Sequence, residues 1–347
     1  ILFCQGPHWK QASLPELERM MNLLVDSYKR SFSYLRLSVL PVCNFKCAYC
    51  LPNGNPTEAL HQKHLTQWEI KRLVKALAGL GIEKVRLTGG EPTLRSDLPE
   101  IASLISTIPG IQKVALTTNG YRLSEIAGHL KESGVTRLNV SVDSLIPKRF
   151  FEITGQDQLL NILKGIETAR KVGFQKIKVN VVVMKDVNDS EYEDFILWSQ
   201  KEDLDVRFIE LMSTEDNVLF FKKRHLDLAS MEAMLPQMGY SLAPREKDGG
   251  PASTWKKTNT QGSVGFIRAY KNGFCDTCNR LRVTSQGELQ LCLFGSGNLA
   301  LRQFLQEDGL EEQIQSEVRL ALAGKAPSHF LREGSHGTTR NLAAMGG

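Results

Sequence analysis

The feature that most constrains the fold is a regular alternation of short β-branched runs with amphipathic segments between residues 35 and 210. Each run is separated from the next by enough residues for a crossover helix, so we expect the runs to pair in parallel. The alternation predicts an α/β fold, a partial (βα)6 TIM-like barrel whose open side could admit a large substrate. The six predicted strands cover residues 35–39, 84–88, 113–118, 137–142, 176–183 and 205–210.

The segments between these strands carry helix signals. Thr66 and Glu69 have the spacing of a capping box, in which two side chains satisfy the first free N–H groups of a helix. Apolar residues then recur on one face of the predicted helix, at Ile70, Leu73, Val74, Leu77 and Leu80. Three further crossover helices are expected over residues 124–131, 159–171 and 189–200.

Composition and chain pattern divide the sequence into three parts. We expect residues 1–24 to form an N-terminal extension, whose Cys4 has no assigned role, residues 25–240 to form the barrel, and residues 241–347 to form a C-terminal elaboration. A hydrophobic content of 41% is enough for a large core. The sequence contains no apolar stretch of about 18 residues, so we expect no membrane span. Its net charge of +5 is smaller than that of a typical nucleic-acid-binding protein.

Six of the seven cysteines fall into two groups of three. The first cysteine group is Cys43, Cys47 and Cys50, and the second is Cys275, Cys278 and Cys292. Three thiolates on a four-iron cluster leave one iron open to a substrate or cofactor, whereas a structural zinc site is closed by four ligands. Zinc remains the alternative, with His61 or His64 as a fourth ligand of the first group. Free thiols in this number favour a reducing, cytoplasmic compartment.

Other polar and glycine-rich motifs follow the predicted strands directly. Gly89-Gly90-Glu91-Pro92 ends the second strand, Thr117-Thr118-Asn119-Gly120 ends the third, and Met212 follows the sixth. Functional residues of such barrels gather at the C-terminal ends of the strands. We therefore expect these motifs to converge with the first cysteine group on one rim.

The first cysteine group, with an aromatic residue before its last cysteine and a Gly-Gly-Glu motif at the next strand end, resembles the radical S-adenosylmethionine (SAM) superfamily. More narrowly, the chain resembles the MoaA family of GTP 3′,8-cyclases from about Val25 to its end. The motifs that carry this resemblance are Leu35-Arg36-Leu37-Ser38, Arg86 to Pro92, Phe151 to Gly155, Arg207 to Glu210 and Phe274 to Arg282.

The resemblance implies a radical SAM barrel with a cluster-binding C-terminal region, and two [4Fe–4S] clusters. The cluster on the first cysteine group would bind and cleave SAM to a 5′-deoxyadenosyl radical, and the cluster on the second would bind the guanine of GTP. By resemblance the SAM contacts are Tyr49, Gly90, Ser141 and Met212, and the GTP contacts are Arg36, Arg86, Thr117, Lys178, Arg280, Leu281 (through its backbone) and Arg282. Gly346 and Gly347 match a terminal Gly-Gly tail that enters the active site.

The implied reaction is the first step of molybdenum cofactor biosynthesis, in which ribose C3′ of GTP is joined to guanine C8. We expect a low-potential electron donor such as a flavodoxin or a ferredoxin. A homodimer and contact with the next enzyme of the pathway are left open, and neither nucleic acid nor a membrane is expected as a partner. Two alternatives remain: a radical SAM enzyme with an auxiliary cluster that modifies a peptide, and a two-zinc nucleic-acid-binding module.

Overall fold

A twelve-stranded sheet forms the centre of the computed structural model, which describes residues 23–246 and 249–343. Neighbouring strands follow the order β14-β13-β12-β3-β4-β5-β6-β7-β8-β11-β10-β9. The eight strands from β12 to β11 in this order pair in parallel. Their bounds are Arg280–Val283 (β12), Tyr34–Ser38 (β3), Lys84–Thr88 (β4), Lys113–Thr118 (β5), Val135–Ser141 (β6), Ile177–Val183 (β7), Asp205–Glu210 (β8) and Ser263–Ile267 (β11).

The six strands predicted from the alternation are β3 to β8, and they lie side by side in chain order. Two parallel strands from the C-terminal region extend this set, β12 beside β3 and β11 beside β8. Antiparallel strands then cover both ends: Tyr240–Leu242 (β9), Ser253–Lys257 (β10), Glu288–Gln290 (β13) and Leu299–Ala300 (β14). Because β9 and β14 end the sheet, the barrel is open, and a separate hairpin is formed by Leu24–Val25 (β1) and Ser31–Phe32 (β2).

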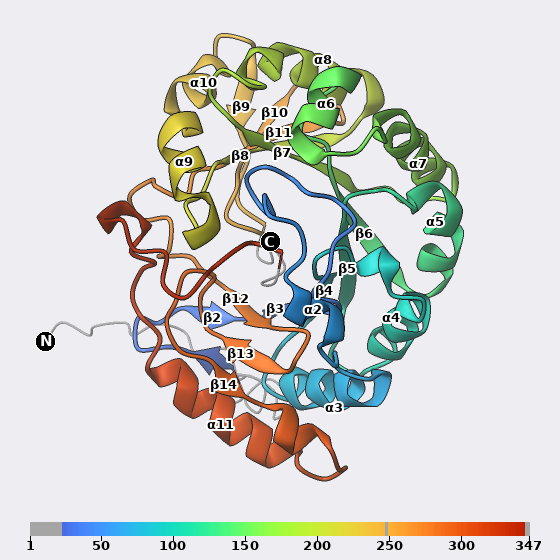
Figure 1. The fold of residues 1–347 in the computed structure, drawn as a ribbon, viewed down its shortest axis with the longest axis vertical. Helices are drawn as coiled ribbons and strands as arrows, with labels where there is room; N and C mark the ends of the chain where they lie inside the picture. Colours follow the sequence, from blue (N-terminus) through green and yellow to red (C-terminus); the bar gives the residue numbers. More distant parts are fainter. Residues whose placement is uncertain (1–22, 247–248, 344–347) are drawn as a thin grey trace, which may run out of the picture.

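Helices wrap the outer face of the parallel strands, as Figure 1 shows down the barrel. The capping box at Thr66 and Glu69 is present at the start of α3. The helix predicted over residues 189–200 begins as a 3-10 turn at Asp189–Glu191, and the sequence analysis does not predict α4 or α6. The helices are Thr57–His61 (α2), Gln67–Ala78 (α3), Leu98–Ser106 (α4), Leu123–Glu132 (α5), Pro147–Thr154 (α6), Leu159–Lys171 (α7), Tyr192–Glu202 (α8), Val218–Arg224 (α9), Ala229–Met234 (α10) and Glu311–Ala323 (α11).

Apolar and polar side chains alternate along the parallel strands, so the outer face of the barrel is apolar and its interior is polar. In β7, Ile177, Val179, Val181 and Val183 are buried in the main hydrophobic core, while Lys178 lines an internal cavity. Branched apolar residues normally fill the interior of an eight-stranded barrel. The polar interior of this barrel therefore indicates that a polar ligand enters it.

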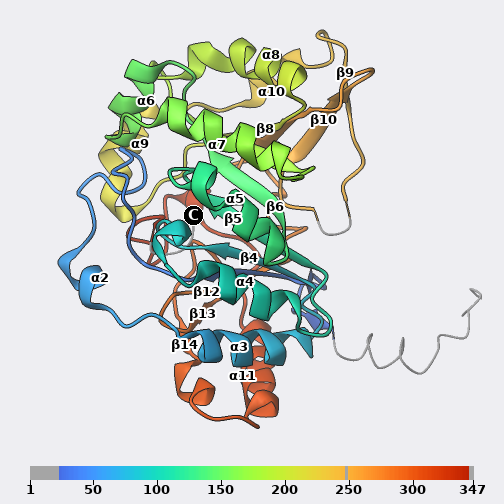
Figure 2. The same cartoon turned by 90° about the vertical axis from the view of Figure 1, so that its right-hand side faces the viewer.

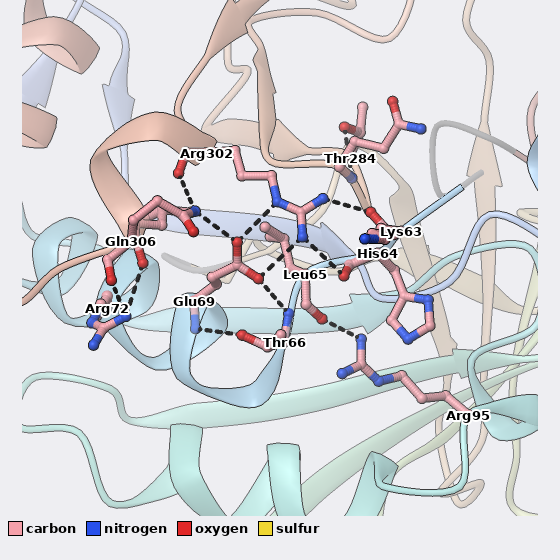
Figure 3. Close-up of polar contacts among 12 residues, drawn as sticks. Lys63, His64, Leu65, Thr66, Glu69, Arg72, Arg95, Thr284, Arg302 and Gln306 are labelled. Carbon is pink, nitrogen blue, oxygen red and sulfur yellow. Dashed lines mark hydrogen bonds and ion pairs between the residues drawn. The ribbon is translucent and has the colours of Figure 1, made fainter. Parts of the chain in front are cut away.

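The C-terminal region packs along the first crossover helix, where α11 lies against α3 in both views (Figures 1 and 2). Figure 3 shows the polar contacts that join the two parts. The Arg302 guanidinium donates to Glu69 Oε1 at 2.9 Å and to the carbonyl of Lys63 at 2.6 Å. Gln306 also donates to Glu69 Oε1. On the barrel side of this contact, Arg95 donates to the carbonyl of Leu65. Within the described residues, no helix is long and apolar enough to span a membrane.

Candidate active site

One internal cavity gathers both cysteine groups. All six thiols line it, and all six are free. Residues of all eight parallel strands, β12, β3 to β8 and β11, complete its wall, so that the two groups open into the same polar space. The predicted site residues that also line it are Arg36, Tyr49, Arg86, Gly90, Thr117, Ser141, Lys178, Met212, Arg280 and Arg282.

The loop of the first cysteine group is held from several sides. Asn55 accepts a hydrogen bond from the Cys43 N–H at 2.9 Å and donates one to the Cys43 carbonyl at 2.8 Å. The N–H groups of Lys46 and Ala48 donate to the carbonyls of Thr154 and Ile153, at the end of α6. These contacts fix the backbone of the loop before any cofactor binds.

Glycine at position 90 is required by the loop that it faces. A Cβ added to Gly90 would lie 2.1 Å from the carbonyl oxygen of Val42, next to Cys43. The adjoining Glu91 N–H donates to that same carbonyl oxygen at 2.9 Å. Glu91 is buried, and its carboxylate accepts from Thr118 Oγ1 at 2.7 Å and from the Asn119 N–H at 2.6 Å. The Gly-Gly-Glu motif thus ties the ends of β4 and β5 to the cysteine loop.

Tyr49 belongs to a buried polar pair. Its hydroxyl donates to Asp143 Oδ2 at 2.7 Å, and Asp143 Oδ1 accepts from the Val182 N–H at 2.8 Å. Burial raises the pKa of Asp143 to about 6. Asn217 donates to the carbonyls of both Tyr49 and Met212. One asparagine therefore positions two of the predicted SAM contacts.

The second cysteine group is anchored by cations. The buried Arg30, paired with Asp26 at 2.6 Å, donates to the carbonyls of Cys275 and Pro327. Lys325 donates to the carbonyl of Leu291, directly before Cys292. Arg30 and Lys325 thereby bind the C-terminal segment to the loop that carries the thiols.

His329, which sequence analysis did not single out, also lies at the second cysteine group. It lines the cavity between Phe274 and Phe294, with ring centroids 5.5 and 5.8 Å away. Burial lowers the pKa of His329, so the neutral imidazole is favoured in this apolar setting.

Three arginines lie side by side on neighbouring strands. Arg282 of β12 is in register with Arg36 of β3, which is in register with Arg86 of β4. The next row toward the strand starts places Arg280, Tyr34 and Lys84 beside one another. Like charges on adjacent strands repel each other, so this arrangement favours a polyanionic ligand between them.

Burial and mutual repulsion shape the charges of this wall. Burial lowers the pKa of Arg207 and of Arg282 to about 10. Burial and then the nearby Arg207 lower the pKa of Lys178 to about 7. Burial acts to raise the pKa of Tyr34, but Arg86, Arg36 and Lys84 outweigh it and lower it to about 7. The Tyr34 hydroxyl accepts a hydrogen bond from Arg86 Nε.

The thiols of the two groups have different surroundings. Burial raises the pKa of Cys43 to about 11 and that of Cys50 to about 12. Burial acts in the same sense on Cys278, but Arg280 and Lys325 outweigh it and lower its pKa to about 7. Among the described residues, no three His, Cys, Asp or Glu side chains are arranged to hold a single metal ion. All six free thiols line the same cavity, and three thiolates from each group could hold an iron–sulfur cluster there.

Leu281 differs from the other predicted GTP contacts. Its side chain is fully buried in the main core and does not line the cavity, which leaves only its backbone for a ligand contact. Gly346 and Gly347 lie outside the described residues. The sequence analysis missed Tyr34, Lys84, Asn139, Asn180 and Arg207, which line the cavity too. Their signal was available, since each stands two residues from a predicted contact or a motif residue on the same strand face.

Two family models match consecutive parts of the chain. Residues 37–198 match the radical SAM superfamily, and residues 204–331 match the Molybdenum Cofactor Synthesis C family. A curated protein of Vibrio atlanticus, named GTP 3′,8-cyclase, is 45% identical over 323 residues, which are 93% of this chain and 97% of that protein. The chain belongs to the GTP 3′,8-cyclase family. A protein of the same name from Mannheimia succiniciproducens is 45% identical, over 96% of this chain and 99% of its own length.

Solved structures share the fold of this family member at low identity. Streptococcus suis SuiB bound to S-adenosylmethionine has a TM-score of 0.61 and 15% identity, covering 91% of this chain and 78% of that chain. SuiB bound to its precursor peptide SuiA has the same TM-score and identity, over 99% and 84%. At this identity the likeness is one of fold, and the precursor peptide is a ligand of SuiB. The radical SAM fold predicted from sequence is confirmed, and the zinc-module alternative is wrong.

Proposed function

We propose that the chain joins ribose C3′ of GTP to guanine C8, giving 3′,8-cyclo-7,8-dihydro-GTP at the start of molybdenum cofactor biosynthesis. Family membership supports this reaction. The observation that carries it is the shared cavity, in which two groups of three thiols flank a wall of arginines. A triphosphate complements the charge of the arginine wall, and the family resemblance implies that the guanine lies beside the second group.

The implied cofactors are two [4Fe–4S] clusters and SAM. Cys43, Cys47 and Cys50 would hold the first cluster, and the residues beside SAM would be Tyr49, Gly90, Ser141 and Met212. Cys275, Cys278 and Cys292 would hold the second cluster beside the guanine. When bound, the first cluster and SAM supply the one-electron chemistry that generates an organic radical.

The protein's own contribution is orientation and charge. Arg36, Arg86 and Arg282 offer forked N–H donors for phosphate oxygens, and Thr117 holds Arg86 in place by accepting from Nη1 at 3.0 Å. Arg280 and Lys178, with Leu281 through its backbone, complete the proposed GTP contacts. A substrate held at both its triphosphate and its base presents a fixed ribose, and fixed geometry lowers the barrier to C–C bond formation.

The last described residues before the proposed Gly-Gly tail lie at the cavity. Leu342 and Ala343, the last described residues, line the cavity, and their backbone hydrogen-bonds the Cys50 thiol. Two glycines leave backbone groups free to approach a ligand closely.

The partners implied by this reaction are GTP and a low-potential electron donor such as a flavodoxin or a ferredoxin. A homodimer, contact with the next enzyme of the pathway, a cytoplasmic location, and the division into residues 1–24, 25–240 and 241–347 remain part of the proposal.

Anaerobic product analysis tests the function. Reconstituted protein with SAM, dithionite and GTP should yield 5′-deoxyadenosine and the cyclised nucleotide in equal amounts, and ATP should not replace GTP. Formation of 5′-deoxyadenosine without any GTP-derived product would contradict the proposal. GTP dependence also separates this reaction from peptide modification by an auxiliary-cluster enzyme.

A further inference from the structure

Two asparagines with buried amide oxygens line the cavity from neighbouring strands. Asn139 of β6 and Asn180 of β7 both contribute to its wall, and Asn139 is only 5% exposed. Each Oδ1 atom is buried, and neither has a hydrogen-bond partner among the described residues. A buried acceptor without a partner is unfavourable, and native proteins rarely leave one unpaired. The two amides therefore point to a ligand that brings hydrogen-bond donors into the cavity.

The register of the sheet places these amides where the proposed SAM and GTP contacts meet. Asn139 is in register with Thr117 of β5 on one side and with Lys178 of β7 on the other, and both of these neighbours are proposed GTP contacts. Asn180 is in register with Ser141 of β6, a proposed SAM contact. Side chains of one strand face the same side at every second residue. The two amides thus lie at the boundary between the two sets of proposed contacts.

The ribose is the part of GTP whose chemistry suits this boundary. The triphosphate is proposed to bind the arginine wall, and its ionised oxygens accept hydrogen bonds rather than donate them. The guanine is proposed to lie beside the second cysteine group. The ribose between them carries 2′- and 3′-hydroxyl groups, and each hydroxyl can donate one hydrogen bond to an amide oxygen. The radical made from SAM must also reach C3′, which carries the 3′-hydroxyl, so the ribose has to lie beside the proposed SAM contacts.

We propose that Asn139 and Asn180 accept hydrogen bonds from the ribose hydroxyl groups of GTP and so hold C3′ toward the SAM site. The proposal deepens the proposed function and rests on it. A site that hydrogen-bonds a substrate hydroxyl rejects an analogue without that hydroxyl, because the buried acceptor is then left unpaired. The two asparagines therefore select a ribonucleotide over a deoxyribonucleotide. They also fix the orientation of the carbon that loses its hydrogen atom.

Binding of deoxy analogues tests these contacts without turnover. Equilibrium dialysis of the anaerobic holoenzyme gives a Kd for GTP, for 2′-deoxyGTP and for 3′-deoxyGTP, and the wild type should bind GTP most tightly. In Asn139→Ala and in Asn180→Ala, affinity for GTP should fall by about three- to tenfold. Affinity for the analogue that lacks the hydroxyl bound by the substituted residue should stay unchanged. Asn298→Ala, at an exposed asparagine before β14, should keep all three wild-type constants.

A conservative variant separates ribose recognition from a structural role. Asn139→Asp keeps an acceptor oxygen, so it should still prefer GTP over the analogue that Asn139→Ala no longer distinguishes. Equal losses of affinity for GTP and both analogues in the two alanine variants would indicate a structural role and overturn the proposal. Weaker SAM binding with unchanged nucleotide constants would assign the amides to SAM and overturn it too, as would a wild type that binds all three nucleotides equally. A wild-type enzyme that binds GTP but forms no cyclised product would instead reject the proposed function.

Discussion

At the scale of the residue, the arginine wall is the most informative arrangement in the molecule. Arg282, Arg36 and Arg86 stand on three adjacent strands in register, and burial followed by Arg282 holds the pKa of Arg36 well below its ordinary value. Repulsion between these guanidinium groups destabilises the ligand-free protein, and a bound polyanion relieves the repulsion. The wall is therefore built for a ligand rather than for stability.

A substitution of Arg280 tests whether GTP and SAM bind to separate residues of the cavity. Arg280→Ala removes charge-assisted hydrogen bonds to the proposed triphosphate, worth about 1.5–3 kcal/mol, so GTP affinity should fall by about one to two orders of magnitude. SAM binding should stay unchanged, because the proposed SAM contacts come from other strands and loops. Equilibrium dialysis with each ligand measures both effects, with the exposed Arg319→Ala of α11 as control. Loss of SAM binding with intact GTP binding would show that Arg280 is wrongly assigned.

Lys178 predicts a pH dependence of GTP binding. Its pKa is about 7 in the free protein, with Asp205 Oδ2 at 3.8 Å and Arg207, Glu246 and Arg137 also near it. A bound triphosphate favours the charged ammonium and raises this pKa, so above pH 7 binding must take up a proton and weakens as pH rises. The deprotonation of Tyr34 changes the cavity charge in the same direction. Each such group adds up to about one tenfold step in Kd per pH unit.

The contribution of Lys178 to the pH dependence of GTP binding can be measured with a substitution that keeps the positive charge. In Lys178→Arg the side chain stays charged, so the slope of log Kd between pH 7 and pH 8.5 should drop by about one. The phosphates contribute little in this range, because the last pKa of a phosphate group is about 6. Equilibrium dialysis at constant ionic strength gives the slope, and an identical slope in wild type and Lys178→Arg would refute the role of Lys178.

At the scale of the element, strands and capped helices were predictable because their signals are local. The predicted bounds of the strands at 84–88, 113–118 and 205–210 agree with β4, β5 and β8, and the capping box places the start of α3. The sequence analysis did not predict α4, which is short and has no side-chain cap hydrogen bond at its start. The contacts between α3 and the C-terminal region join residues more than 200 positions apart. No local pattern reports such pairs.

Arg302 holds these two elements together, as Figure 3 shows. Burial acts to raise the pKa of Glu69, but hydrogen bonds from the Thr66 backbone, Arg302 and Gln306 outweigh it and lower it to about 2. Arg302→Ala leaves a buried carboxylate with fewer donors and should destabilise the protein by about 1.5–3 kcal/mol. The midpoint of anaerobic urea unfolding measures this, with Arg319→Ala as a neutral control. Because the carboxylate is the stabilised form, the variant's deficit should shrink as pH falls from about 4.5 toward 2, and a pH-independent deficit would contradict this account.

At the scale of the whole molecule, the site joins segments that the sequence separates. The pairing of β12 with β3 brings Arg280 and Arg282 to Tyr34 and Arg36, across more than 240 positions of the chain. The sequence motifs predicted that the two cysteine groups and the arginines bind their ligands in one site, because thiolates suit iron–sulfur clusters and arginines suit phosphates. Strand spacing could have suggested Tyr34, Lys84 and Arg207 as wall residues, but their neighbours across the sheet follow only from its register. The C-terminal region thus supplies two parallel strands, β11 and β12, to the central sheet.

A chain that ends at residue 240 tests this unity. It would lack β11 and β12, whose Val264, Phe266, Leu281 and Val283 are buried in the main core. The edges of β3 and β8 would lose their parallel partners and expose unpaired backbone groups, which promote aggregation. We therefore expect the shortened chain to show no cooperative thermal transition by circular dichroism and to elute as aggregates, while the full chain unfolds cooperatively. A monomeric, cooperatively folding 1–240 chain would mean that the six central strands suffice and that the second cysteine group is carried by a separable part.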